Sequence, residues 1–308
     1  MLRYTLRRVL SALPIAFIAI TVCFFILRMA PGGPFDRERP LPPAVMKNVL
    51  AHYNLDKPLY EQYWLYISGV LQGDFGPSMT SYDFSVSQLL SIGLPFTLML
   101  GGTAFVIATL IGIVAGMVAA VQQNKWPDYV LVLVVMLGVI VPNFLMGSLL
   151  QLLFGVYLKW LPAGGWPSGG SIIHLILPVT VLAWPHAARI SRLMRGSMIE
   201  VLGTNYIRTA QAKGLGDRLV LARHAIKPAL VPVVSYLGPG LSYLLTGSLV
   251  VENIFGLPGI GRYFIQAALN RDYGLVLGTT IFYVLLILVL NLIVDMVYAW
   301  LDPKVRYR

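Results

Sequence analysis

The sequence predicts an all-α integral membrane protein with about six transmembrane helices, forming a single polytopic domain over residues 1–308. Three observations predict it: long apolar runs, a hydrophobic fraction of 57% against a charged fraction of 12%, and a one-sided distribution of positive charge. Runs of about 20 apolar residues match the thickness of the hydrocarbon core of a bilayer. The predicted spans are residues 9–27, 95–121, 129–158, 172–189, 229–251 and 275–300.

The positive charge indicates how these spans are oriented. An even number of spans puts both termini on one side, and the inner segments then hold most of the 23 basic residues, with Arg189 at the inner end of the fourth span. The net charge of +10 therefore lies inside, as the positive-inside rule requires. We expect both termini in the cytoplasm. Because topology and the lipid bilayer account for the basic charge, we expect no nucleic acid partner.

A long outer segment, residues 31–92, separates the first two spans. Its Pro-Gly-Gly-Pro opening and the prolines near position 42 are turn signals. Residues 43–53 and 59–71 then have the pattern of short amphipathic helices, and the aromatic side chains of the second suit a membrane surface. Two interpretations stay open: a cap that seals the outer face, and a docking surface.

The inner loop, residues 191–227, predicts a compact cytoplasmic knob. Ser197 followed by Glu200 is a capping-box pattern, which predicts a helix over residues 198–213 that ends at Gly214. Gly216 and Asp217 then start a second helix that runs towards Pro228. An ordered loop of this kind is more than a tether between two spans needs.

Helix breakers occur at mid-membrane depth in three spans. Pro142 and Asn143 fall near the middle of the third span, and Gly238-Pro239-Gly240 near the middle of the fifth. Pro178 and Pro185 are expected to interrupt the fourth. Broken backbone is tolerated in a membrane only where protein or a water-lined cavity satisfies the freed groups. The breaks are therefore either packed kinks or the lining of a path.

Two further segments have glycine patterns. The outer loop 252–274 contains Gly256, Pro258, Gly259 and Gly261, which predict a tight backbone of defined shape. In the second span Gly112 and the glycine four residues later form a small-x-x-x-small pair, which predicts close helix packing. Packing of this kind occurs within one chain or against a partner membrane subunit.

Several kinds of chemistry have no sequence support. The sequence contains no Gly-Lys dipeptide and hence no Walker A phosphate loop, so we expect no ATP hydrolysis by that route. The four histidines lack metal-ligand spacing, and we expect neither a catalytic residue nor a bound metal or cofactor. Asp295 is the one acidic candidate within a span, either for a proton relay or for a structural hydrogen bond.

One inner-loop motif resembles a known family. Residues 208–214 read Arg-Thr-Ala-Gln-Ala-Lys-Gly, similar to the Glu-Ala-Ala, three residues, Gly motif of binding-protein-dependent ABC importer permeases. The sequence departs from that motif at Arg208 and Thr209, and Pro228 lies one place late. Residues 73–78, 195–200, 252–261, 270–273 and 301–307 resemble other segments of the dipeptide and oligopeptide group, so the resemblance covers essentially the whole chain.

The resemblance implies a type I ABC importer permease fold in a bacterial inner membrane, as the B-type membrane subunit of an oligopeptide importer. It implies a second homologous permease subunit, two cytoplasmic ATPases that bind ATP and Mg, and a periplasmic binding protein that delivers a peptide. Two permease subunits would together form the path, which switches access when the ATPases close. The resemblance thus implies that the partner ATPases supply the energy source that this chain lacks.

The resemblance also assigns candidate site residues. A coupling segment would seat on an ATPase through Arg208, Thr209, Ala210, Ala212, Lys213, Gly214, Leu215, Gly216 and Asp217. A peptide backbone needs polar partners along the path, for which the candidates are Asn143, Ser148, Gln151, Ser235, Tyr236, Ser242 and Thr246. The candidate contacts for the binding protein or the entering peptide are Gly256, Leu257, Gly259, Asn270, Arg271, Asp272 and Tyr273.

Alternatives remain at this point. The path residues are also candidates for ordinary interhelical hydrogen bonds, and the loop 252–274 for a plug of the outer mouth. A secondary peptide transporter driven by an ion gradient through Asp295 is the main rival function. A non-transporting membrane receptor is a third interpretation. Nickel, haem or other small solutes are alternative substrates, because permeases of the group share these motifs.

Overall fold

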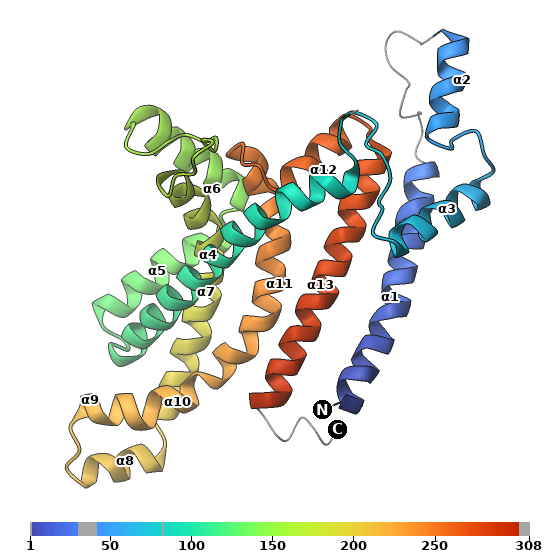
Figure 1. Ribbon diagram of the computed structural model, residues 1–308. Helices are drawn as coiled ribbons and strands as arrows, with labels where there is room; N and C mark the ends of the chain where they lie inside the picture. The colour runs from blue at the N-terminus through green and yellow to red at the C-terminus, as the bar shows by residue number, and fades with distance from the viewer. Residues whose placement is uncertain (1, 30–41, 82, 302–308) are drawn as a thin grey trace. The chain divides into compact units, whose positions relative to one another are not determined.

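The computed structural model describes residues 2–29, 42–81 and 83–301 (Figure 1). The predicted segment 31–92 is therefore described only in part, and the motif at 301–307 lies almost entirely outside the described residues, as does the side chain of Asp295. The regular secondary structure of the described residues is helical, with turns and loops between the helices and an isolated bridge between Pro77 and Ser85. The prediction of an all-α chain is confirmed.

The helices account for most of the described chain. In order they are α1 (Leu2–Met29), α2 (Pro43–His52), α3 (Leu59–Leu71), α4 (Val86–Val121), α5 (Trp126–Ile140), α6 (Asn143–Leu150), the π-helix η1 (Gln151–Tyr157), α7 (Ile173–Leu202), α8 (Asn205–Ala212), α9 (Asp217–Val220), the π-helix η2 (Leu221–Ala225), α10 (Ile226–Ala229), α11 (Val231–Ile254), α12 (Ile260–Leu269) and α13 (Tyr273–Leu301). The two short outer helices are confirmed as α2 and α3.

Within the described chain, five helices are long and apolar enough to cross a membrane. They are Leu10–Met29, Val86–Val121, Ile173–Leu202, Val231–Ile254 and Tyr273–Ile293. A sixth span is obtained when the bent pair Trp126–Ile140 and Asn143–Tyr157 counts as one. The prediction of about six spans therefore holds, with the predicted third span as the bent pair.

The break in the third span has a local cause. Val141, the residue before Pro142, adopts extended dihedral angles with φ −83° and ψ 122°, because a following proline disfavours the helical region. Pro142 itself is extended, with φ −59° and ψ 141°, and the chain bends by 107° between α5 and the segment that begins at Asn143. The predicted interruption at this position is confirmed.

The predicted interruptions of the fourth and fifth spans are wrong. α7 runs unbroken through Pro178 and Pro185, and α11 runs unbroken through Pro239. A proline inside a helix removes one backbone hydrogen bond, and packing against neighbouring helices compensates for that loss in a membrane protein. Pro178 is buried, and so are Gly238 and Gly240 on either side of Pro239.

The chain divides into two compact units, with boundaries inside α4, between Leu257 and Pro258, and inside α13. The first comprises residues 1–97 and 258–292. Its core joins α1, α3 and α13 through Ile20, Phe24, Tyr63, Leu277 and Ile281. The rings of Phe24 and Tyr63 pack edge to face with 5.4 Å between their centroids, and the Tyr63 hydroxyl shares a 2.7 Å hydrogen bond with Thr21.

The second unit comprises residues 98–257 and 293–308, and α7 is its central helix. α7 packs against α5, α6 and α11 and is the most buried of the candidate spans. Where α4 crosses α7, a Cβ at Gly112 would lie 2.7 Å from Ile190 Cβ, and one at Gly116 would lie 2.5 Å from the Ser191 carbonyl oxygen. The predicted close helix packing is confirmed, and it occurs within this chain.

An ion pair fixes α5 to α7 in the second unit. Asp128, with 2% of its surface exposed, accepts two hydrogen bonds from Arg195, of 2.7 Å from Nε and 2.6 Å from Nη2. The backbone N–H of Asn124 donates a third at 3.1 Å. Such a two-pronged geometry suits the planar guanidinium, and a carboxylate removed from water requires partners of this kind.

We predict that Arg195→Gln lowers the thermal unfolding midpoint in detergent, equivalent to about 1.5–3 kcal/mol of unfolding free energy, because Asp128 loses its charged partner. Arg192→Gln is the control, since Arg192 is exposed and its polar contact is to the sulfur of Met136, at 3.0 Å. In Asp128→Asn/Arg195→Gln the loss should be smaller than the sum of the two single losses. Additive losses would show that the pair contributes nothing as a pair.

Candidate functional site

The knob is formed by α8, α9 and the connecting residues 213–216, and it follows the C-terminal end of α7 (Figure 1). The predicted helix over residues 198–213 is wrong, because α7 continues to Leu202 and α8 begins only at Asn205. Ser197 lies inside α7 and caps nothing. The apolar series of Ile190, Met194 and Met198 packs continuously, so no break occurs at the capping-box sequence.

The predicted turn between the two short helices is confirmed. Gly214 has φ +80°, a left-handed conformation that L-residues with a side chain rarely adopt. Its N–H donates to the Gln211 carbonyl at 2.9 Å, which ends α8 in the expected manner. Gly216 is the N-cap of α9, which starts at Asp217 as predicted. The backbone therefore holds the knob in one defined shape.

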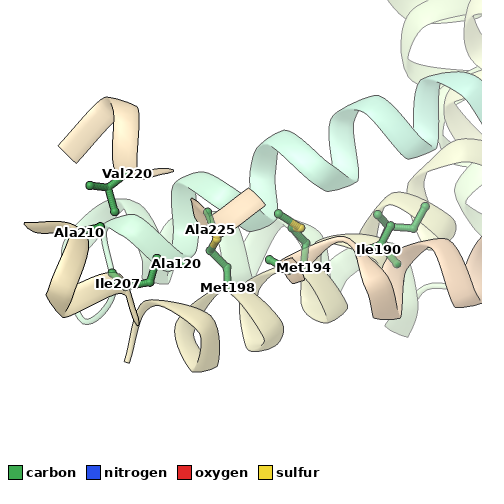
Figure 2. Packing of buried hydrophobic residues seen from close by; sticks show 10 residues of the cluster. Ala120, Ile190, Met194, Met198, Ile207, Ala210, Val220 and Ala225 are labelled. Atoms are coloured by element: carbon green, nitrogen blue, oxygen red, sulfur yellow. The ribbon is translucent and has the colours of Figure 1, made fainter. Parts of the chain in front are cut away.

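The knob has a buried side and an exposed side. Figure 2 shows Ile207, Ala210 and Val220 on the buried side, in the same apolar cluster as Met194 and Met198 of α7. Ala210 is 6% exposed, so this predicted coupling residue is packed inward and does not offer a contact surface. Leu215 is half-buried. The remaining predicted coupling residues are exposed: Arg208, Thr209, Ala212, Lys213, Gly214, Gly216 and Asp217.

Two exposed apolar side chains on the knob were missed by the sequence analysis. Tyr206 on α8 is 46% exposed and Leu219 on α9 is 41% exposed. The sequence signal for these two residues was their spacing, which places them outside the helix faces that carry the buried residues Ile207, Ala210 and Val220. Large apolar groups among exposed charges are common at protein interfaces, and the knob therefore has the composition of a contact surface.

A cavity of about 360 Å³ lies at the bend between α5 and α6. α5, α6, α7 and α11 all contribute to its wall, which is mostly apolar with a few polar groups. Its lining residues are Gly138, Val139, Val141, Pro142, Asn143, Phe144, Pro185, His186, Arg189, Tyr243, Gly247 and Val250. Concave sites with this mixture of groups are typical of small-molecule binding. The broken span therefore lines a cavity, and its place in a translocation path stays a prediction.

The polar groups of the cavity come from α6, α7 and α11. The Arg189 guanidinium lies over the Tyr243 ring, 5.4 Å from its centroid. His186 is 4% exposed, and its Nδ1 shares a 2.9 Å hydrogen bond with the Tyr236 hydroxyl. The His186 and Tyr243 rings are 5.6 Å apart between centroids. These contacts hold the cation and the aromatic rings in one cluster.

The structure divides the predicted path residues into those at the cavity and those that form hydrogen bonds or are buried elsewhere. Asn143 lines the cavity, and Tyr236 contacts it through His186. Gln151 instead donates to the backbone carbonyls of Ala163, at 2.6 Å, and Ile254. Ser242 is buried. Three hydroxyls bond to carbonyls of their own helices: Ser148 to Phe144, Ser235 to Val231, and Thr246 to Ser242.

Sequence reasoning missed three of the polar residues in the wall of this cavity, His186, Arg189 and Tyr243. It placed Arg189 at the inner end of the fourth span, among the cytoplasmic charges. In the structure α7 continues for about three more turns beyond Arg189, which lies opposite Tyr243, near the middle of α11. The signal available was an arginine between the apolar residues Ala188 and Ile190, both buried.

The predicted outer loop 252–274 is largely helical, since it contains the end of α11 and the whole of α12. Of its candidate contacts, Leu257 and Gly259 are buried, while Gly256 and Tyr273 are half-buried. Asn270 and Arg271 are exposed. Asp272 is fully buried, so a direct partner contact of this residue, as predicted, does not fit the structure.

Asp272 instead fastens the segment 78–80 to the start of α13 within the first unit. Its Oδ2 accepts from the Ser78 hydroxyl at 2.5 Å, the Thr80 hydroxyl at 2.8 Å, and the backbone N–H groups of Met79 and Thr80. Its Oδ1 accepts from the Leu275 N–H at 2.9 Å. A carboxylate with this many donors is satisfied without any partner chain.

The comparisons with known proteins agree with these features. A family model described as "Binding-protein-dependent transport system inner membrane component" matches residues 112–307, and the N-terminal model of the same transport-system component matches residues 1–85. The first match covers more than half of the chain. This chain belongs to that family. It is therefore an inner membrane component of a binding-protein-dependent transport system, with several membrane spans.

Curated relatives match this inner membrane component over its whole length. It is 50% identical over 307 residues to the oligopeptide transport system permease protein OppB of Haemophilus influenzae, covering 100% of both chains. It is 41% identical over 306 residues to the dipeptide transport system permease protein DppB of Bacillus subtilis, covering 99% of this chain and 98% of that one.

A solved structure shares the fold. The crystal structure of an amino acid ABC transporter with histidines matches with a TM-score of 0.53 and 19% sequence identity. The match covers 68% of this chain and 92% of the other. At this identity the likeness shows the fold alone, and it confirms the predicted ABC importer permease fold.

We predict that Asp272→Ala lowers the thermal unfolding midpoint in detergent, because buried donors lose their acceptor, at about 1–3 kcal/mol for each unsatisfied group. Arg271→Glu is the matched control, since Arg271 is the adjacent exposed residue. It should leave the midpoint unchanged. An equal decrease in both variants would show that the residue position, and not the carboxylate network, stabilises this segment.

Proposed function

We propose that this chain is the membrane subunit of an ATP-driven peptide importer and forms half of its translocation path. The observation that carries the proposal is the 50% identity, over the full length, to a permease of an oligopeptide transport system. The 41% identity to a dipeptide permease supports peptides as the substrate class, ahead of nickel, haem or other small solutes.

In this proposal the exposed side of the knob seats on a cytoplasmic ATPase. Arg208, Lys213 and Asp217 provide charges for that contact, and Gly214 and Gly216 allow close approach of its backbone. Tyr206 and Leu219 add apolar area. The shared cluster of the knob and α7 supports a rigid connection, through which closure of two ATPases would move the spans and switch access between the two sides.

The remaining partners follow from the same proposal. A second homologous permease subunit completes the path, ATP and Mg bind the ATPases, and a periplasmic binding protein delivers the peptide. Both termini lie in the cytoplasm, and Asn270 and Arg271 are the exposed candidates for contact with the binding protein. Affinity resides in the binding protein, so the cavity at Asn143 needs to hold the peptide only weakly.

We predict that the purified chain hydrolyses no ATP, because its sequence contains no Gly-Lys phosphate loop. Reconstituted with its permease, ATPase and binding-protein partners, it should accumulate peptide when ATP is supplied, and an ionophore that collapses the proton gradient should not slow uptake. Uptake that follows the proton gradient in the absence of ATP would establish the secondary transporter instead.

We predict that Gly214→Arg uncouples the importer, lowering peptide uptake and ATPase assembly while membrane insertion persists. The left-handed conformation at Gly214 costs a non-glycine residue about 1–2 kcal/mol, and arginine adds bulk on the exposed side of the knob.

Gly196→Arg is the matched control for this variant. Gly196 is exposed on α7, and a Cβ there would meet no atom within 4 Å. The control adds the same charge and bulk outside the knob, and it should keep normal peptide uptake and normal assembly with the ATPases. Normal uptake by Gly214→Arg would exclude the knob as the coupling element.

A further inference from the structure

The cavity at the bend of the third span contains a cation with no acidic neighbour in its wall. Among the residues that line it, Arg189 carries a positive charge and none is Asp or Glu. Within the part of the chain that the structure describes, Arg189 forms no ion pair. A charged side chain inside a membrane span is costly, and such residues commonly mark a substrate or ion pathway.

The other interactions of Arg189 position it without neutralising it. Its guanidinium lies 5.4 Å from the centroid of the Tyr243 ring, which attracts a cation through its electron-rich face. Arg195, two turns along the same helix, differs because Asp128 binds it through two hydrogen bonds. α7 therefore carries two different cations. Arg195 is neutralised by Asp128 in a structural ion pair, whereas the charge of Arg189 is available to the cavity.

The groups around Arg189 suit an anionic ligand of limited size. Asn143, His186 and Tyr243 supply the other polar groups of the lining, and the rest of the wall is mostly apolar. The volume of about 360 Å³ is at the lower end of the range for small-molecule sites. A space of this size accommodates one end of a peptide and not the whole of an oligopeptide.

We propose that Arg189 binds the C-terminal carboxylate of the transported peptide at this cavity. The inference rests on the proposed function. A transporter that accepts many peptide sequences finds constant charges only at the two termini of its substrate. A positive group without acidic neighbours selects the carboxylate terminus, since an amino terminus would require an acid. The planar guanidinium also matches a carboxylate geometrically, with two parallel hydrogen bonds.

The test compares trialanine with trialanine amide, which lacks the terminal charge. Uptake of each is measured in proteoliposomes that contain the full complex, with saturating binding protein preloaded with either peptide. The measured quantity is the ratio of the free-acid rate to the amide rate. Any preference of the binding protein enters wild type and variant equally and cancels when their ratios are compared.

In Arg189→Gln the ratio should fall about tenfold relative to wild type, corresponding to about 1.4 kcal/mol, mainly through slower uptake of the free acid. Arg192→Gln is the matched control: it removes the same charge from the next turn of α7, outside the cavity lining, and should leave the ratio unchanged. Where Arg189→Gln does not assemble, Arg189→Lys decides, since lysine keeps the charge but loses the forked geometry and should lower the ratio.

An unchanged ratio in an assembled Arg189 variant would overturn the inference. Equal slowing of both peptides would assign Arg189 to packing or to an acidic group of a second membrane subunit. Failure of the proposed function looks different, because the wild-type complex would then accumulate neither peptide in the presence of ATP.

Discussion

The satisfaction of backbone hydrogen bonds in the membrane is the constraint on which the rest of this structure depends. An apolar surrounding provides no partner for a free N–H or carbonyl group, so the spans are continuous helices wherever packing permits. Pro142 is where continuity ends, with a bend of 107°. The exposed backbone at this break faces a cavity with polar groups in its wall, so the break and the candidate binding site are one feature.

α7 connects that cavity with the knob. The same unbroken helix carries His186 and Arg189 at the cavity, and Met194 and Met198 in the cluster that includes the buried side of the knob. A continuous helix with close contacts to α4 and an ion pair to α5 moves as a stiff element more readily than it bends. The proposed coupling therefore needs no chain of separate rearrangements, because displacement of the knob acts on the helix that bears the cavity cation.

The sequence was sufficient for features with local causes and insufficient for those set by distant packing. The bend at Pro142, the left-handed Gly214 and the two outer helices follow from residues adjacent in sequence. The continuity of α7 through Pro178 and Pro185 depends on its neighbours in space, and the same apolar packing overrode the capping-box pattern at Ser197. The place of Arg189 in the cavity wall was missed for this reason, since the sequence analysis treated residue 189 as the end of the span.

Burial also divides residues that a motif presents as equivalent. Ala210 and Ala212 belong to one short motif, yet Ala210 packs in the core of the knob while Ala212 is exposed. Arg271 and Asp272 are adjacent, yet Arg271 is exposed while Asp272 is bound by donors from residues 78–80, almost 200 positions earlier. A motif shared with relatives therefore combines buried positions, which stabilise the local fold, with exposed positions, which form the surface. Only the exposed positions, such as Ala212 and Arg271, are free to contact a partner, and substitutions there should change assembly or docking without changing stability.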